Sequence, residues 1–165
     1  MRHILTSVVL LVLLFPALAM GGEVTWVTRD DLVVTDGLHY KKFTDVPFTG
    51  KVTGKSQGSI KDGKQTGPWV RYRADGQLWS KGTFKDGKED GPWVSYWDNG
   101  RIHEKGTYKD GEKDGPWVSY WKNGQLWSKG TFKDRKLDGP WVGYDEYGTV
   151  NEYLTGTYKD GVKVD

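Results

Sequence analysis

The chain has 165 residues, of which 36% are hydrophobic, 14% are aromatic and 23 are glycine. Because the hydrophobic residues include so many aromatic ones, the share of aliphatic residues is low, which argues against a helical bundle or a large α/β enzyme core. The many aromatic residues argue against disorder. Lysine and arginine (24) nearly balance aspartate and glutamate (22). The balance gives no general electrostatic reason to bind nucleic acid. Because cysteine is absent, disulfides, thiolate zinc sites and a catalytic thiol are excluded.

Residues 1–19 resemble a secretory signal peptide. Arg2 and His3 precede an apolar run that ends at Pro16, and Ala17-Leu18-Ala19 supplies a small-x-small cleavage site. We therefore expect cleavage near Ala19 and an exported protein, either periplasmic or secreted. The alternative is a retained anchor helix, for which the apolar run is short, because a membrane span needs about 20 residues.

A 24-residue repeat dominates the rest of the chain. After a lead segment at 20–35 and a divergent capping repeat at 36–66, four units follow at 67–90, 91–114, 115–138 and 139–165. Each unit opens with Gly-Pro-Trp-Val and later carries Gly-Thr-(Phe/Tyr)-Lys-Asp, which arrives two residues late in the fourth unit. A fixed period of this length predicts a repeat architecture in which each unit contacts mainly its neighbours.

Each unit is predicted to form one β-hairpin. In the second unit, 93–97 is rich in β-forming residues, Asp98-Asn99-Gly100 is typical of a turn, and 101–108 returns. No window has helical spacing. The predicted fold is therefore all-β: an elongated, single-layer sheet of stacked antiparallel hairpins with little or no helix.

The turn type decides which side chains share a face. A two-residue loop would pair Tyr96 with His103, whereas a three-residue loop with Gly100 in a bulge would pair Tyr96 with Ile102 and Val94 with Glu104. The three-residue loop is favoured because it gathers the recurrent apolar positions on one face, with Gly106 leaving room for an aromatic ring. That face would hold Val94, Tyr96, Ile102, Gly106 and Tyr108.

The opposite face would hold Trp93, Ser95, Trp97, Arg101, His103 and Lys105, and several of its positions differ between units. Large exposed aromatic patches usually mark interaction sites. The candidate binding residues are therefore Trp79, Trp97, His103, Trp121 and Trp127. The alternative is that these rings only stack against one another and protect a thin sheet.

The repeated pattern Gly-Pro-Trp-x-x-Tyr-x-x-Asn-Gly, followed by Gly-Thr-Tyr-Lys-Asp-Gly-x-x-Asp-Gly, resembles the variant MORN repeat. The opening 36–40 and 47–52 are similar to bacterial multi-repeat members that are labelled as antitoxins of toxin–antitoxin systems. The resemblance implies stacked hairpins and a role in protein–protein or peripheral membrane contact, and the fold is not known as an enzymatic one.

No catalytic, metal or cofactor site is predicted. His39 and His103 stand in dissimilar contexts, and each Asp-Gly turn offers a single carboxylate beside a lysine, whereas calcium loops need several converging oxygen ligands. We expect a non-catalytic scaffold with a protein partner and no nucleic acid. The alternatives are binding to cell-envelope carbohydrate such as a cell-wall polymer, binding to a membrane surface, and an antitoxin-like role.

Overall fold

The computed structural model describes residues 24–165, so the predicted signal peptide at 1–19 lies outside the described part. Before the repeats it has β1 (Trp26–Thr28), a 3₁₀ turn η1 (Arg29–Asp31), β2 (Leu32–Thr35), β3 (Leu38–Lys41), β4 (Gly50–Thr53) and β5 (Ser56–Lys61). The repeats form β6 (Lys64–Tyr72), β7 (Leu78–Lys85), β8 (Lys88–Tyr96), β9 (Ile102–Lys109), β10 (Glu112–Lys113), β11 (Gly115–Tyr120), β12 (Leu126–Lys133), β13 (Lys136–Leu137), β14 (Gly139–Gly143), β15 (Gly156–Lys159) and β16 (Val162–Lys163).

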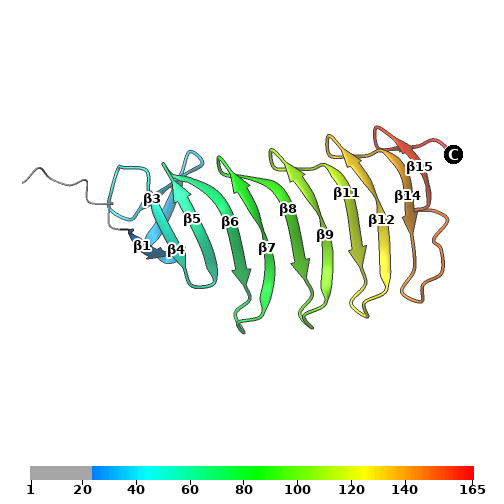
Figure 1. Ribbon diagram of the computed structural model, residues 1–165, viewed down its shortest axis with the longest axis horizontal. Helices are drawn as coiled ribbons and strands as arrows, with labels where there is room; N and C mark the ends of the chain where they lie inside the picture. The colour runs from blue at the N-terminus through cyan, green and yellow to red at the C-terminus, as the bar shows by residue number, and fades with distance from the viewer. Residues whose placement is uncertain (1–23) are drawn as a thin grey trace, which may run out of the picture.

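Most of these strands form one long open sheet, confirming the predicted fold. The sheet has 14 strands, and from β4 onward the strands follow chain order as stacked antiparallel hairpins (Figure 1). Between residues 24 and 165 the only helical element is the 3₁₀ turn, so the expectation of little helix is confirmed. No helix in this part of the chain is long and apolar enough to cross a membrane.

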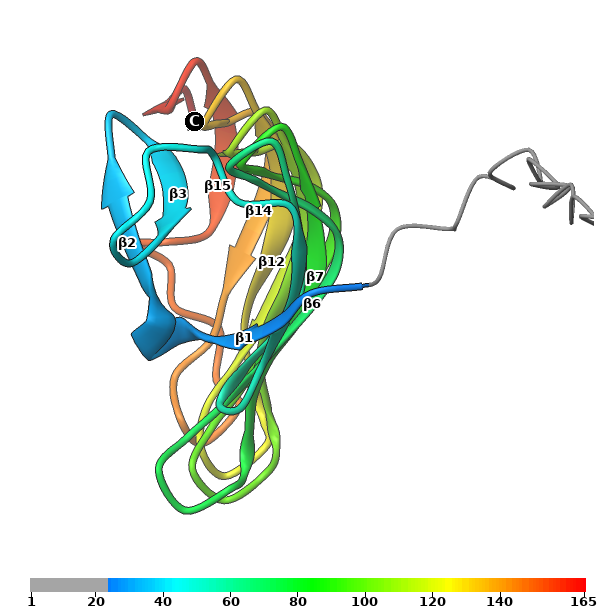
Figure 2. The same cartoon turned by 90° about the vertical axis from the view of Figure 1, so that its left-hand side faces the viewer.

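The N-terminal end departs from the simple stack in two ways. Strand β1 pairs with β4 in parallel, and β2 and β3 form a separate two-stranded sheet. Figure 2 shows this small sheet on the concave side of the long one. There Leu32 packs against a buried cluster that includes Phe48 and Trp69. The short strand β1 is thus the edge strand at this end, and the small sheet covers the concave face beside it.

Two kinds of turn connect the strands. At Asp86 and Gly87 both φ angles are positive (51° and 86°), as a two-residue type I′ turn requires. At the opposite end, Gly100 has φ 79°, its N–H donates to the Trp97 carbonyl, and the Trp97 N–H donates to the Arg101 carbonyl. The predicted three-residue loop with a left-handed Gly100 is thus confirmed.

The register is only partly as predicted. Tyr96 pairs with Ile102 as expected, but Val94 pairs with Lys105 and not with Glu104, because His103 is an extra residue that forms a β-bulge. The bulge shifts the alternation by one residue. Gly106 therefore lies opposite Trp93, so the prediction that Gly106 and Tyr108 share a face with Val94 was wrong. Lys105 likewise lies with Val94 and not with Trp93.

A continuous ladder of rings runs along the sheet and defines what we call the ladder face. Neighbouring rings meet edge to face, with centroids 5.3–6.1 Å apart and interplanar angles of 66–88°. The rings are Trp69, Phe84, Trp93, Tyr108, Trp117, Phe132 and Trp141. Since Leu32 packs against Trp69, the ladder face is the concave one.

Glycine makes room for this ladder. A Cβ atom at Gly106 would overlap the ring of Trp117, and the same holds for Gly82 with Trp93 and for Gly130 with Trp141. The predicted contact between a ring and bare glycine therefore exists. The ring, however, comes from the Gly-Pro-Trp of the next unit and not from Tyr96.

Candidate functional site

The bulge residue of each hairpin is one of the candidate binding residues. Trp79 and Trp127 occupy the position of His103, because the pairing register shifts at the same point in all three hairpins. A bulge re-aims the side chain of the extra residue. Trp79 is 47% exposed and Trp127 is 37% exposed. We call the five candidates Trp79, Trp97, His103, Trp121 and Trp127 the tryptophan edge, since they lie beside the three-residue loops.

Four of the five candidates are brought together as two pairs. The rings of Trp97 and His103 lie 4.0 Å apart between centroids at 53°, and those of Trp121 and Trp127 lie 5.5 Å apart at 48°. The His103 Nδ1 atom also lies 3.4 Å from the Ser95 hydroxyl, which places this edge on the ladder side of the sheet. In the hairpin that contains Trp79, Arg73 occupies the position that Trp97 and Trp121 occupy in the other two hairpins.

Trp97 and Trp121 connect successive hairpins, which the sequence reasoning missed. The indole N–H of Trp97 donates to the Tyr120 carbonyl over 3.0 Å, and that of Trp121 donates to the Tyr144 carbonyl over 3.1 Å. Arg73 donates to the Tyr96 carbonyl in the same way over 2.6 Å. The shared signal in the sequence is a long side chain with an N–H donor. These positions therefore have a structural role whatever they bind.

The loops themselves are also linked from unit to unit. The Asn99 amide donates to the Lys122 carbonyl over 2.8 Å, while its oxygen accepts from the Arg101 backbone N–H. Lys122 forms an ion pair of 2.7 Å with Asp98. This hydrogen bond from Lys122 lowers the pKa of the Asp98 carboxyl below its ordinary value. The loop end of the sheet is thus held in register beside the tryptophan edge.

Near the middle of the ladder face, Glu104, Lys113 and Trp117 bind one another. The Glu104 carboxylate accepts from Lys113 Nζ over 3.0 Å and from the Trp117 indole N–H over 3.2 Å. Lys113 Nζ also lies 3.9 Å from the Trp117 ring centroid, a cation–π contact. Burial raises the pKa of Tyr108 to about 12, and the carboxylates of Glu104 and Glu89 act in the same direction. These charges stabilise the ladder.

The part of the chain that the structure describes contains no group of three or more histidine, cysteine, aspartate or glutamate residues that could hold a metal ion. His39 is buried, and its Nδ1 atom lies 3.0 Å from the Gly63 carbonyl. Within the tryptophan edge, Trp79 and Trp127 are exposed, and Trp97, His103 and Trp121 are half-buried.

Three consecutive segments of the chain match the protein family described as MORN repeat variant: 65–86, 89–110 and 113–134. These three segments are similar to MORN repeats. Each matched segment spans one hairpin of the sheet, from the strand with Gly-Pro-Trp to the Lys-Asp turn. A search of curated proteins found no match to the chain. The MORN matches describe the repeat itself and name no toxin partner, so the antitoxin label of the resemblance is not shown.

The predicted fourth unit at 139–165 lies beyond the three MORN matches. Its strands β14 and β15 nevertheless pair Gly139 with Tyr158 and Trp141 with Gly156. The same pairing joins Gly115 to Phe132 and Trp117 to Gly130 in the preceding matched segment. The hairpin geometry therefore continues past the last match.

Proposed function

We propose that the chain is a non-catalytic, exported scaffold that binds a protein partner through its tryptophan edge. The observation on which the proposal rests is the exposure of Trp79 and Trp127, two indoles that the β-bulges turn outward. Tryptophan is enriched among the residues that contribute most to protein–protein binding energy. MORN repeats are consistent with a scaffold for protein or membrane interaction.

The geometry suits an elongated partner surface. Trp79 in β7 and Trp127 in β12 are separated by four strand spacings, which is about 19 Å at about 4.8 Å per spacing. His103 lies at the equivalent position between them. The hydrogen bonds from Trp97 and Trp121 fix the neighbouring loops, so the exposed rings are held on a rigid support. A rigid support lowers the entropy cost of binding.

The experiment is capture of partners from a cell-envelope fraction by the purified chain, followed by mass spectrometry. The double variant Trp79→Ala/Trp127→Ala removes the two exposed rings and should lose the captured protein. Trp97 and Trp121 are left intact because their hydrogen bonds support the fold. The matched control is Tyr153→Ala, which removes a ring that is 92% exposed in the connection between β14 and β15. Unchanged capture by the double variant would overturn the proposal.

Binding of a cell-wall polymer is the second candidate, and the open faces of Trp79 and Trp127 favour it because exposed indoles stack on sugar rings. Sedimentation with purified wall material separates the two. A protein scaffold stays in the supernatant, whereas a carbohydrate-binding module pellets with the wall and loses this ability in the same double variant. Flotation with anionic liposomes provides the corresponding measurement for a membrane surface.

A further inference from the structure

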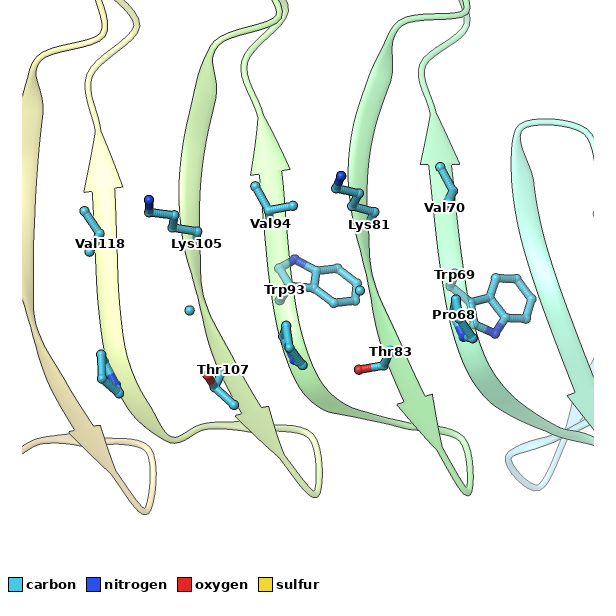
Figure 3. Close-up of a pocket in the computed structure, with 14 residues that line it drawn as sticks. Pro68, Trp69, Val70, Lys81, Thr83, Trp93, Val94, Lys105, Thr107 and Val118 are labelled. Atoms are coloured by element: carbon cyan, nitrogen blue, oxygen red, sulfur yellow. The ribbon is translucent and has the colours of Figure 1, made fainter.

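The convex side of the sheet, which we call the proline face, has an apolar groove with a strict pattern. Pro68 pairs with Thr83 and Val70 pairs with Lys81, and the same two pairs recur in the next two hairpins. The groove has a volume of about 630 Å³ and extends from Pro68 across three hairpins to Val118. Figure 3 shows valine and lysine side chains of successive strands alternating in one row, with the threonines in a second row.

The groove is apolar at its base and basic along one row. Lys81 and Lys105 line the groove, and Lys129 continues the row in the next hairpin; each lysine lies opposite a valine of a neighbouring strand. Within residues 24–165 none of these three lysines forms an ion pair with a carboxylate. The nearby carboxylate Glu104 pairs across the sheet with Ser95 and therefore lies on the ladder face. Lys105 Nζ lies 5.9 Å from the Tyr120 ring centroid, a cation–π contact. Although the net charge of the chain is near zero, this sheet face therefore carries a line of three lysines that no carboxylate of the described residues neutralises by an ion pair.

The spacing of these lysines selects one ligand conformation. Equivalent residues of adjacent hairpins are two strand spacings apart, about 9.6 Å. A polyproline II helix repeats every three residues at about 3.1 Å per residue, which is about 9.3 Å. It therefore presents every third side chain in the same direction, at a spacing that nearly equals the distance between equivalent residues of adjacent hairpins. An extended β-strand advances about 10 Å in three residues, but its third side chain points to the opposite face.

We propose that the proline face binds an acidic, proline-rich segment in the polyproline II conformation, with a carboxylate at every third residue. The carboxylates pair with Lys81, Lys105 and Lys129. The prolines of the ligand lie along the apolar groove lined by Pro92, Val94 and their equivalents. The backbone of a polyproline II ligand is pre-ordered, so little entropy is lost on binding. This surface is opposite the tryptophan edge and does not depend on it.

The test uses the synthetic peptide (Glu-Pro-Pro)₅ and isothermal titration calorimetry with the purified chain. Binding should weaken at least tenfold in Lys81→Glu/Lys105→Glu. The matched control is Lys85→Glu/Lys109→Glu, which makes the same change of charge on β7 and β9, four residues farther along and outside the groove. This control should retain affinity within about threefold. Circular dichroism verifies that both variants are folded.

Two further peptides test the spacing and the charge. A peptide of the same composition with its five glutamates clustered should bind at least tenfold more weakly, and (Lys-Pro-Pro)₅ should not bind. Equal binding of the clustered peptide, an equal loss in both lysine variants, or no binding of (Glu-Pro-Pro)₅ would overturn the proposal. Binding only to anionic vesicles would also overturn it. Unchanged peptide binding by Trp79→Ala/Trp127→Ala separates this proposal from the function of the tryptophan edge.

Discussion

Replacing Gly106 with alanine tests whether the ladder depends on bare backbone beneath each tryptophan. Gly106 is in the extended strand β9, where alanine ordinarily stabilises by about 0.4–1 kcal/mol because it restricts the unfolded chain. Here the added Cβ would overlap the ring of Trp117, a side chain that is only 1% exposed. The ring can move only by disturbing its edge-to-face contacts with Tyr108 and Phe132.

The expected cost follows from these contacts. Overpacking a close-packed site costs about 1–3 kcal/mol, and each lost aromatic pair adds about 0.5–1.5 kcal/mol. Displacement of Trp117 also strains its hydrogen bond to Glu104. We therefore expect Gly106→Ala to lower the free energy of unfolding by about 3 kcal/mol, a large part of the about 5–15 kcal/mol that keeps a protein folded.

Urea unfolding followed by tryptophan fluorescence measures this change in the free energy of unfolding. The same substitution made in a Trp117→Leu variant tests its cause. In Trp117→Leu the ring atoms that meet the new Cβ are absent, so Gly106→Ala should be neutral there or stabilise by a few tenths of a kcal/mol. The reversal of sign distinguishes a steric clash from a general loss of strand geometry. A cost of less than about 1 kcal/mol in the native background, or the same cost in both backgrounds, would refute the reasoning.

Three further predictions concern single residues. Arg135 has φ 71° where other units have glycine, so Arg135→Gly should raise the free energy of unfolding by about 0.5–1 kcal/mol; a loss in urea denaturation would contradict this. Because the pKa of Tyr108 is raised to about 12, its neutral form stabilises the fold fully below pH 10, and this contribution is lost as the pH rises through 12. The unfolding midpoint of Tyr108→Phe should therefore fall less steeply than that of the parent chain between pH 10 and 12, and equal slopes would contradict the assignment. Asp75 occupies the position of Asn99, so Asp75→Asn should add a hydrogen bond to the Asp98 carbonyl and raise the thermal midpoint by a few degrees, about 0.5–1 kcal/mol; an unchanged midpoint would show that this loop does not reach its neighbour.

The fold could be predicted because the local chemistry repeats. Five Lys-Asp turns have positive φ at the aspartate, and the Asn-Gly loops close the other end, so the position and direction of each strand follow from short-range rules. The start of the chain has no such repetition. The parallel pairing of β1 with β4 depends on contacts of Val27 with residues far along the chain, which no local pattern indicates.

The assignment of faces failed for an equally physical reason. One extra residue in a strand exchanges every side chain beyond it between the two faces, and neither His103 nor its tryptophan equivalents differ in type from ordinary strand residues. The role of Trp97 was hidden because the corresponding positions vary: Arg73 and Trp121 donate as Trp97 does, whereas the last unit has Asp145. What the three donating side chains share is an N–H donor for the next hairpin, a property that a comparison of hydrophobicity does not detect.

The structural requirements of one hairpin account for most of its side chains. Glycine and the ladder ring fill the concave side, the donors at Trp97 and Arg73 join neighbouring units, and turn residues close both ends. Two sets of side chains are left without such a role: the exposed indoles at the bulges, and the valine and lysine row on the convex side. The bulge positions and the lysine row both recur in each hairpin, at about 9.6 Å. A partner with a matching period gains the same contacts from each added hairpin, so its affinity depends on how many repeats it spans.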